Sequence, residues 1–216
     1  MFLRRRPRPG PLAGSEWPSP RTPLAELPLL AVDMETTGLR PARHSIVSIA
    51  WVPVNGRSID LSRAGYHVVS GTPGVSVGSS AIIHQLTDED LAAGIPESEA
   101  IEQLLHALRG RVLLAHFAPV EEGFLRAACR RHYRQTVRLP IVDTFVLERR
   151  HMERMGTYPR GEDLRLPRAR ERYSLPRYPG HHALHDALGC AELYLAQTVR
   201  RAATGETLGD LPHSGT

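Results

Sequence analysis

The arrangement of apolar and polar positions along this chain predicts strands first, and then strands that alternate with helices. Short runs that are continuously apolar, or apolar at every second position, are typical of strands. Five such runs occur, at residues 29–36, 46–54, 58–69, 112–115 and 140–143. Asn55-Gly56 separates the second run from the third, and this pair predicts a hairpin turn.

Helical spacing appears between and after the later strands. Four apolar residues follow the i, i+3, i+4, i+7 spacing of one helix face: Ile101, Leu104, Leu105 and Leu108. Pro119 is expected to open a second helix, Asp143 to cap the start of a third, and residues 182–203 to form a long last helix. Residues 154–180 are rich in Arg, Pro and Gly and predict an irregular basic loop. The order of elements predicts an α/β domain with a central five-stranded mixed sheet flanked by helices.

The composition adds an expected domain organisation. A chain of 216 residues is long enough for one domain with a substantial core. Residues 1–26 are rich in Pro, Arg, Gly and Ser and lack periodicity, so we expect a disordered or loosely docked arm. The domain itself is expected to span residues 27–203, followed by a short polar tail at 204–216.

Charge and apolar content exclude some classes of protein. The formal net charge is +4 and all 27 basic residues are Arg, which suits a nucleic-acid partner without requiring one. No apolar run approaches the roughly 18–20 residues of a membrane span, so no membrane association is expected. The basic start is not followed by the apolar stretch of a signal peptide, and a cytoplasmic location is expected. Cys129 and Cys190 fall in predicted helices and are expected to be buried thiols.

Asp33 and Glu35 stand two residues apart at the end of the first apolar run. Because side chains alternate along a strand, both carboxylates should point to the same face of the sheet. Two neighbouring anions repel each other unless a cation lies between them or one of them is protonated. These residues alone leave two interpretations: a divalent-metal site with oxygen ligands, or a solvated strand end before a Thr-Thr-Gly turn.

His181 and Asp186 fall at the start of the last predicted helix. The helix dipole lowers the pKa of a histidine there and nearby anions raise it, so His181 could act as a general base near neutral pH. We interpret His182 and His185 as solvated or capping residues. A zinc site built from His182 and Asp186 lacks an obvious set of further ligands.

A third segment runs from His116, at the end of a predicted strand, to Leu125. Glu121 and Glu122 fall in the first turn of the following helix, where the helix dipole stabilises carboxylates. This effect alone is enough to explain both residues.

Together the three segments resemble the DnaQ-like, or DEDD, family of 3′–5′ exonucleases in its histidine-bearing branch. The family motif D-x-E-T-T-G matches residues 33–38, and H-N-x-x-F-D-x-x-F-L aligns with residues 116–125. The motif H-x-A-x-x-D-A matches residues 181–187. The resemblance covers about residues 28–200 and implies a ribonuclease H-like fold.

Two residues depart from the family pattern in the second motif. Glu121 stands where the family has Asp, and Phe117 stands where it has Asn. The spacing to the following Phe-Leu pair favours Glu121 over Glu122. Ile83-His84 resembles the start of the substrate-side loop I-H-G-x-T of the family.

The resemblance implies hydrolysis of a terminal phosphodiester with two divalent cations, Mg²⁺ or Mn²⁺. The implied metal ligands are Asp33, Glu35, Glu121 and Asp186. Asp33 would serve both ions, Glu35 and Asp186 one of them, and Glu121 the other. His181 would take the proton from the attacking water.

The implied substrate is single-stranded nucleic acid with a free 3′ end, DNA favoured over RNA, as in DNA repair or proofreading. Met34, Thr36 and His84 are the candidate substrate contacts. An exoribonuclease that trims RNA 3′ ends would use the same catalytic residues. A nucleic-acid-binding module with weakened catalysis is supported by Glu121 alone. We expect a free-standing enzyme rather than a subunit held by a polymerase, although polymerase association and a homodimer are both compatible with the sequence.

Overall fold

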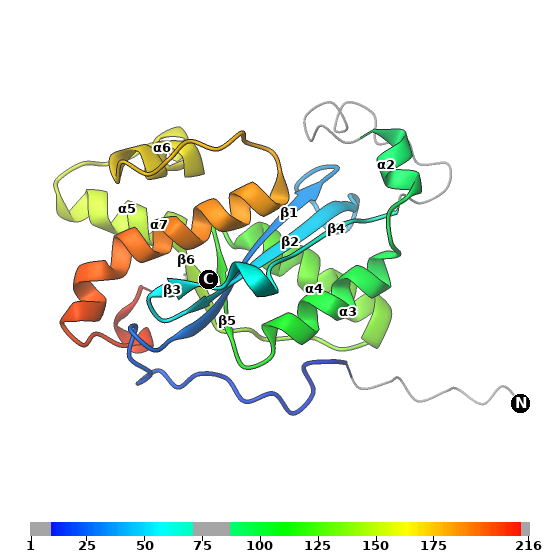
Figure 1. Ribbon diagram of the computed structural model, residues 1–216, viewed down its shortest axis with the longest axis horizontal. Helices are drawn as coiled ribbons and strands as arrows, with labels where there is room; N and C mark the ends of the chain where they lie inside the picture. Colours follow the sequence, from blue (N-terminus) through cyan, green and yellow to red (C-terminus); the bar gives the residue numbers. More distant parts are fainter. Residues whose placement is uncertain (1–9, 71–86, 213–216) are drawn as a thin grey trace, which may run out of the picture.

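The computed structural model describes residues 10–70 and 87–212, which form a mixed sheet between two groups of helices (Figure 1). The strands are β1 (Pro28–Thr36), β2 (Ile46–Asn55), β3 (Ser58–Ile59), β4 (Gly65–Val68), β5 (Val112–Ala115) and β6 (Ile141–Asp143). The α-helices are α2 (Asp88–Ala92), α3 (Glu97–Leu108), α4 (Pro119–Tyr133), α5 (Thr144–Arg154), α6 (Leu166–Arg172) and α7 (Ala183–Ala203). The predicted α/β class with a mixed sheet is confirmed.

The strand β1 lies inside the sheet, whose order is β3-β2-β1-β5-β6, with β4 also pairing with β2. β1 is antiparallel to β2 and parallel to β5, and β5 is parallel to β6. Pairing between β1 and β5 ends at Ala31 and Leu114, so the last residues of β1 extend beyond β5. The carboxyl ends of the parallel strands therefore meet at the edge where α4 and α5 begin, and open α/β sheets commonly bind ligands there.

The two faces of the sheet carry separate apolar clusters. Leu29 and Ala31 of β1 belong to the cluster that contains the buried residues of α7. Leu30, Val32 and Met34 belong to the cluster that contains the buried residues of α3 and α4. This alternation places every odd-numbered residue of β1 toward α7, including the two carboxylates at its end.

The expected single strand at residues 58–69 is broken in two. A short 3₁₀ helix, Leu61–Arg63, separates β3 from β4. Asp60 caps this turn, because its Oδ1 accepts hydrogen bonds from the backbone N–H and the hydroxyl of Ser62. Local side-chain bonds of this kind compete with strand pairing. Within residues 10–70 and 87–212 the sheet consequently has six strands rather than five.

The basic segment 154–180 is more ordered than its composition indicates. It contains a 3₁₀ helix, Gly161–Leu164, and the helix α6. Arg170 of α6 is 4% exposed and donates 2.7 Å hydrogen bonds to the carbonyls of Gly189 and Pro176. A Cβ at Gly189 would lie 3.3 Å from the guanidinium, so a larger residue there would make this packing of α6 against α7 tight.

The segment just before β1 lies against the segment that follows α7. The N–H of Leu24 donates to the carbonyl of Glu206, and the N–H of Leu208 donates to that of Thr22. Leu24 and Leu211 are buried in the same apolar cluster. The domain limits at residues 27 and 203 remain a prediction. The contacts show that the segments just outside these limits pair with each other.

Two further sequence expectations can be compared with the structure. Cys129 and Cys190 are buried free thiols in helices, as predicted. Within the described ranges, no helix combines the length and the apolar character needed to cross a membrane.

Candidate active site

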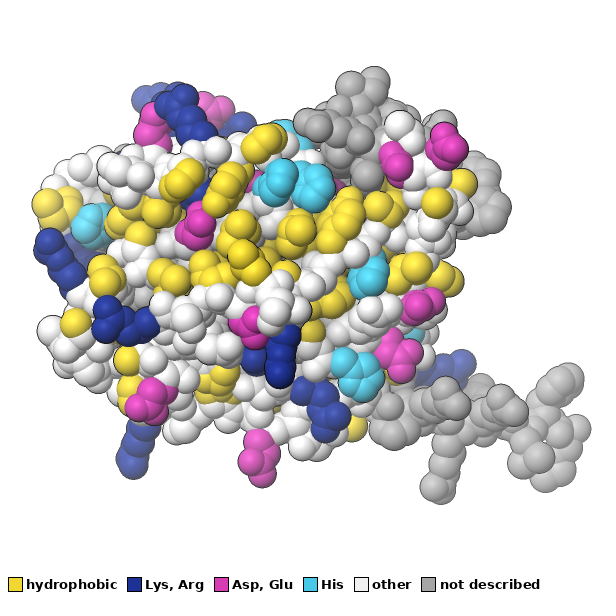
Figure 2. Space-filling model, in the orientation of Figure 1, with side chains coloured by type: hydrophobic (Ala, Val, Ile, Leu, Met, Phe, Trp, Pro, Cys, Tyr) yellow, Lys and Arg dark blue, Asp and Glu magenta, His cyan; other side chains and the backbone are white. Residues whose placement is uncertain are grey.

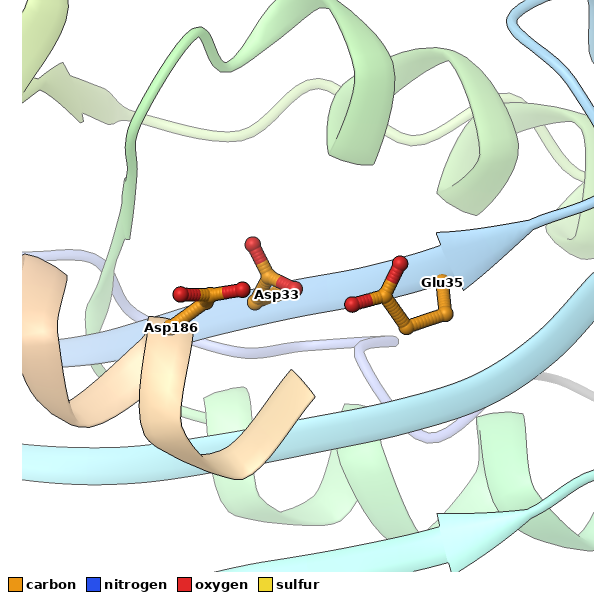
Figure 3. A group of neighbouring side chains, drawn as sticks. All are labelled: Asp33, Glu35 and Asp186. Atoms are coloured by element: carbon orange, nitrogen blue, oxygen red, sulfur yellow. The ribbon is translucent and has the colours of Figure 1, made fainter. Parts of the chain in front are cut away.

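Asp33 and Glu35 project from the face of β1 that α7 covers, and Asp186 in the first turn of α7 faces them (Figure 3). Each of the three offers a carboxylate oxygen that lies within 4.8 Å of the other two. Among residues 10–70 and 87–212, no other group of three His, Cys, Asp or Glu side chains comes this close together. Residues about 150 positions apart in the sequence thus form one acidic cluster.

A fourth carboxylate, Glu121, belongs to the first turn of α4. Its side chain is 4% exposed, and its buried Oε2 has no hydrogen-bond partner. Its charge contributes to the raised pKa of Asp33, so the two carboxylates are electrostatically close. The neighbouring candidate, Glu122, instead forms a 2.9 Å ion pair with Arg126. The structure therefore supports the choice of Glu121 over Glu122.

Burial, more than any other cause, raises the pKa of each carboxyl group in this cluster. It raises the pKa of Glu35 to about 7 and the pKa of Glu121 to about 8. The pKa of Asp33 is raised well above its usual value by burial and then by its acidic neighbours. The pKa of Asp186 is also raised, although the N–H of His181 opposes this shift.

These acidic groups fit a divalent cation. A buried carboxylate is costly unless a proton, a hydrogen bond or a positive charge compensates it, and Oε2 of Glu121 has no hydrogen bond. The donor atoms are all carboxylate oxygens, which are ligands suited to Mg²⁺ and Mn²⁺. The same cluster could hold one or two such ions.

His181 lies beside the acidic cluster. Its charge lowers the pKa of Glu35, and its backbone N–H donates a 3.0 Å hydrogen bond to Oδ2 of Asp186. Its φ is +63°, a left-handed conformation that is uncommon outside glycine. The exposed imidazole is therefore held near the carboxylates by an unusual backbone geometry.

A pocket of about 710 Å³ opens over this arrangement. Asp33, His181 and Asp186 line the side of the pocket that holds the acidic cluster, and Arg165 also lines the pocket. Much of the remaining surface is apolar and comes from Leu39, Phe117, Phe145, Leu166 and Pro167. The pocket therefore combines a candidate metal site with a mainly apolar wall.

His182 and His185 stack with other rings and do not serve as caps. The ring of His182 lies 4.9 Å from that of Tyr66 on β4 and 4.5 Å from that of His185. His182 precedes α7 but its side chain makes no capping hydrogen bond. Figure 2 shows histidine side chains gathered beside apolar ones over the start of α7. These contacts pack the start of α7, the helix that carries Asp186, against β4.

The structure gives a different result for each of the three predicted substrate contacts. The side chain of Met34 is 5% exposed and packs in the cluster under α3 and α4, so only its backbone is left for a substrate. Thr36 is buried, and its hydroxyl donates to the carbonyl of Gly38. His84 lies outside the described residues.

Asp143 has a larger structural role than the predicted cap of one helix. It caps α5, accepting from the N–H of Phe145 at 2.9 Å, as predicted. It also accepts from the N–H groups of Phe117 and Ala118 at the start of α4. One carboxylate thus holds the starts of two helices, and the apolar residues Phe117 and Phe145 both line the pocket. The alignment of the second motif indicated an unusual residue at 117, but no sequence signal gave its conformation.

Comparison with known proteins identifies the family. The family model described as exonuclease matches residues 30–194. The DNA polymerase III subunit epsilon of Treponema pallidum is 26% identical over 175 residues, which are 80% of this chain and 77% of that protein. The PolC-type DNA polymerase III of Halalkalibacterium halodurans is 28% identical over 167 residues, which are 76% of this chain. This chain spans only 11% of the length of that polymerase.

Solved structures of exonucleases share the fold. The zinc-bound complex of Escherichia coli exonuclease I with single-stranded DNA has a TM-score of 0.70 at 15% identity. The match covers 85% of this chain and 42% of that one. Cell-death related nuclease 4 has a TM-score of 0.66 at 15% identity, over 85% of this chain and 66% of that one. Since the family model matches most of its length, this chain belongs to the exonuclease family, and the predicted membership of the DnaQ-like family is confirmed.

Proposed function

We propose that this chain removes nucleotides from the 3′ end of single-stranded DNA, using two divalent cations, Mg²⁺ or Mn²⁺. One observation carries the proposal: three carboxylates converge within 4.8 Å beside a fourth whose buried oxygen has no partner. Such a set of acidic groups is suited to holding cations, and the exonuclease family supplies the class of reaction.

Each carboxylate has a proposed part in holding the cations. Asp33 would serve both ions, because the charges of Glu121, Asp186 and Glu35 all act on it. Glu35 and Asp186 would hold one ion, and Glu121 would help to hold the other. When bound, the cations would neutralise charge on the phosphate and activate the attacking water.

His181 would accept a proton from that water on its imidazole. The side chain is exposed at the pocket and lies beside Glu35 and Asp186, so a proton taken there can leave to solvent. The bond from its backbone N–H to Asp186 would keep the imidazole in place during the reaction. A positioned general base of this kind contributes roughly 10²–10⁴-fold to a rate.

The preference for DNA rests on the relatives. Curated relatives are named as DNA polymerase III proteins, and a solved structural neighbour is a complex with single-stranded DNA. A strand in the pocket could meet the backbone of Met34 and the region of Thr36, and His84 remains a proposed contact. A free-standing cytoplasmic enzyme is our proposal, with association with a polymerase as its alternative.

The test is degradation of 5′-labelled single-stranded DNA and RNA of one sequence, with Mn²⁺, with Mg²⁺ and with excess chelator. We expect a 3′–5′ ladder on DNA that requires a divalent cation. The test variant is Asp33→Asn, which removes a central charge of the cluster. Its matched control is Glu122→Gln, which removes a carboxylate outside the cluster. A faster ladder on RNA would establish the exoribonuclease alternative instead. Binding without cleavage under all metal conditions would indicate a module that has lost its chemistry.

A further inference from the structure

The proposed general base, His181, stands in the segment that joins α6 to α7, rather than inside a helix or strand (Figure 1). Its side chain is exposed to solvent. An exposed side chain on an irregular segment samples many orientations, whereas a base is effective only within hydrogen-bond reach of the proton that it accepts. The bond to Asp186 restrains His181 from the α7 side. Placement of the imidazole therefore also requires contacts that hold the chain before His181.

A buried arginine of α6 holds this segment against α7. The guanidinium of Arg170 donates 2.7 Å hydrogen bonds to the carbonyl of Pro176 in the segment and to the carbonyl of Gly189 in α7. It also forms a 2.8 Å ion pair with Glu192 of α7. Because a guanidinium carries several N–H donors in a rigid planar arrangement, this one side chain joins α6, α7 and the segment between them.

Tyr178 extends these contacts toward His181. The guanidinium carbon of Arg170 lies 4.6 Å from the centre of the Tyr178 ring. The ring also stacks on His185 of α7, with centroids 6.0 Å apart. The hydroxyl of Tyr178 donates a 2.9 Å hydrogen bond to Oε1 of Glu192. Arg170, Tyr178 and Glu192 thus contact one another, and we call these three residues the clamp.

The chain between the clamp and His181 is short. Only Pro179 and Gly180 separate Tyr178 from His181, and the proline ring fixes one of the φ angles between them. His181 itself has a φ of +63°, and a strained conformation of this kind persists only where the surrounding contacts enforce it. The clamp before His181 and the bond to Asp186 after it supply such contacts.

We propose that the clamp positions His181 for the reaction by fixing the backbone that leads to it. This inference rests on the proposed function, in which His181 accepts the proton of the attacking water. Arg170, Tyr178 and Glu192 do not line the pocket over the carboxylates, so they act through His181 and not by contact with the strand. They are positioning residues, and weakening the clamp should lower kcat while leaving KM close to its wild-type value.

Tyr178→Phe is the variant that tests the clamp. It removes the hydroxyl that is bonded to Glu192 and keeps the ring beside Arg170. Substitution of Arg170 is less informative, because it would leave a buried carboxylate and two carbonyls without their donor and destabilise the domain. A base that is held less firmly loses part of its roughly 10²–10⁴-fold contribution, so we expect kcat to fall about tenfold and KM to change by less than about twofold.

Tyr173→Phe is the matched control. The hydroxyl of Tyr173 donates a 3.0 Å hydrogen bond to Oε2 of Glu148 in α5, so this variant also removes a tyrosine hydroxyl that is bonded to a carboxylate. Tyr173 lies at the end of α6, and its bond leads to α5 and not to α7. Both variants should lower the urea midpoint of unfolding to a similar extent, but Tyr173→Phe should leave kcat unchanged. Equal losses of kcat in the two variants would show a general structural effect and overturn the proposal.

A double-mutant cycle tests whether the clamp acts through His181. The fall in kcat caused by Tyr178→Phe should be absent in a His181→Asn background, because no imidazole is left to be positioned. The same fold-change in both backgrounds would also overturn the proposal.

Amide hydrogen exchange gives a readout that needs no turnover. In peptides that cover residues 174–182, exchange should be faster in Tyr178→Phe than in the wild type, and unchanged in Tyr173→Phe. Equal exchange in the wild type and Tyr178→Phe would show that other contacts hold the segment, and would overturn the clamp. If the wild type degrades no strand with any divalent cation, the proposed function itself fails, and the exchange rates alone decide whether the clamp holds the segment.

Discussion

The backbone N–H of His181 donates a 3.0 Å hydrogen bond to Oδ2 of Asp186. This contact joins the proposed general base to a proposed metal ligand, across the start of α7. It stabilises the left-handed backbone of His181, where φ is +63°. A substitution at Asp186 should therefore affect both the charge of the cluster and the placement of the imidazole, and the two effects can be separated.

Asp186→Asn and Asp186→Ala should both lower kcat/KM on single-stranded DNA by about 100-fold or more, because a charged metal ligand is lost. Asn keeps an oxygen that can accept the N–H of His181, and Ala does not. The free energy of unfolding of Asp186→Asn should therefore exceed that of Asp186→Ala by about 1 kcal/mol, the usual net value of one hydrogen bond. Labelled-strand kinetics and urea unfolding measure the two effects. Wild-type rates in both variants would contradict the assignment of Asp186.

His181→Asn tests the proposed base. Asn tolerates positive φ better than most residues, so the backbone should be preserved while the imidazole is lost. We expect kcat to fall about 10²–10⁴-fold and the stability to change little. A wild-type kcat in His181→Asn would contradict the assignment of His181 as the base.

The acidic cluster predicts that the metal-free protein loses stability as the pH rises. The pKa of Glu121 is raised from 4.5 to about 8 in the folded protein, so the native state keeps a proton that the unfolded chain has released. Stability from this group is present at low pH and is lost as the pH passes from 4.5 toward 8. Glu35, with a pKa of about 7, acts in the same direction. In chelator, the free energy of unfolding should fall between pH 6.5 and 8.5, with Glu121 contributing on the order of 2 kcal/mol.

Glu121→Gln is the matched variant for this titration. It removes the ionisable group but keeps its shape, so the fall in stability over the same pH interval should be smaller. His116 does not affect the comparison, because burial lowers its pKa to about 4 and its titration near 6.5 in the unfolded chain is the same in both proteins. Mn²⁺ should raise the melting temperature of the wild type more at pH 8.5 than at pH 6.5. A flat profile for the metal-free wild type would show that Glu121 does not titrate in this interval.

The strand pattern was enough to predict one half of the acidic cluster. Alternation along β1 puts Asp33 and Glu35 on the face that α7 covers, and the structure confirms this. Their approach to Asp186 depends on the packing of α7 across the sheet, which no local period determines. The resemblance to a family supplied that link.

Features set by backbone conformation and tertiary contacts were beyond the sequence. The positive φ of Phe117 depends on hydrogen bonds to Asp143, which is 26 residues away in the chain. The order of segment 154–180 depends on Arg170, whose bonds to Gly189 and Pro176 could not be inferred from a basic composition. Asp60 was not recognised as a cap that divides a strand.

Arg165 should contribute a phosphate contact to the strand. It lines the pocket, its side chain is 73% exposed, and its nearest acidic partner, Glu162, is 3.9 Å away. A guanidinium paired this loosely is available to bind phosphate. Arg165→Gln should weaken binding of single-stranded DNA regardless of sequence and reduce the slope of log Kd against log salt concentration by about 0.7. Arg57→Gln removes the same charge from an exposed turn after Asn55, which pairs with Pro28 at the far end of β1, and should leave the slope unchanged. Fluorescence anisotropy at several salt concentrations measures both slopes, and equal slopes for the two variants would exclude Arg165 from the path of the strand.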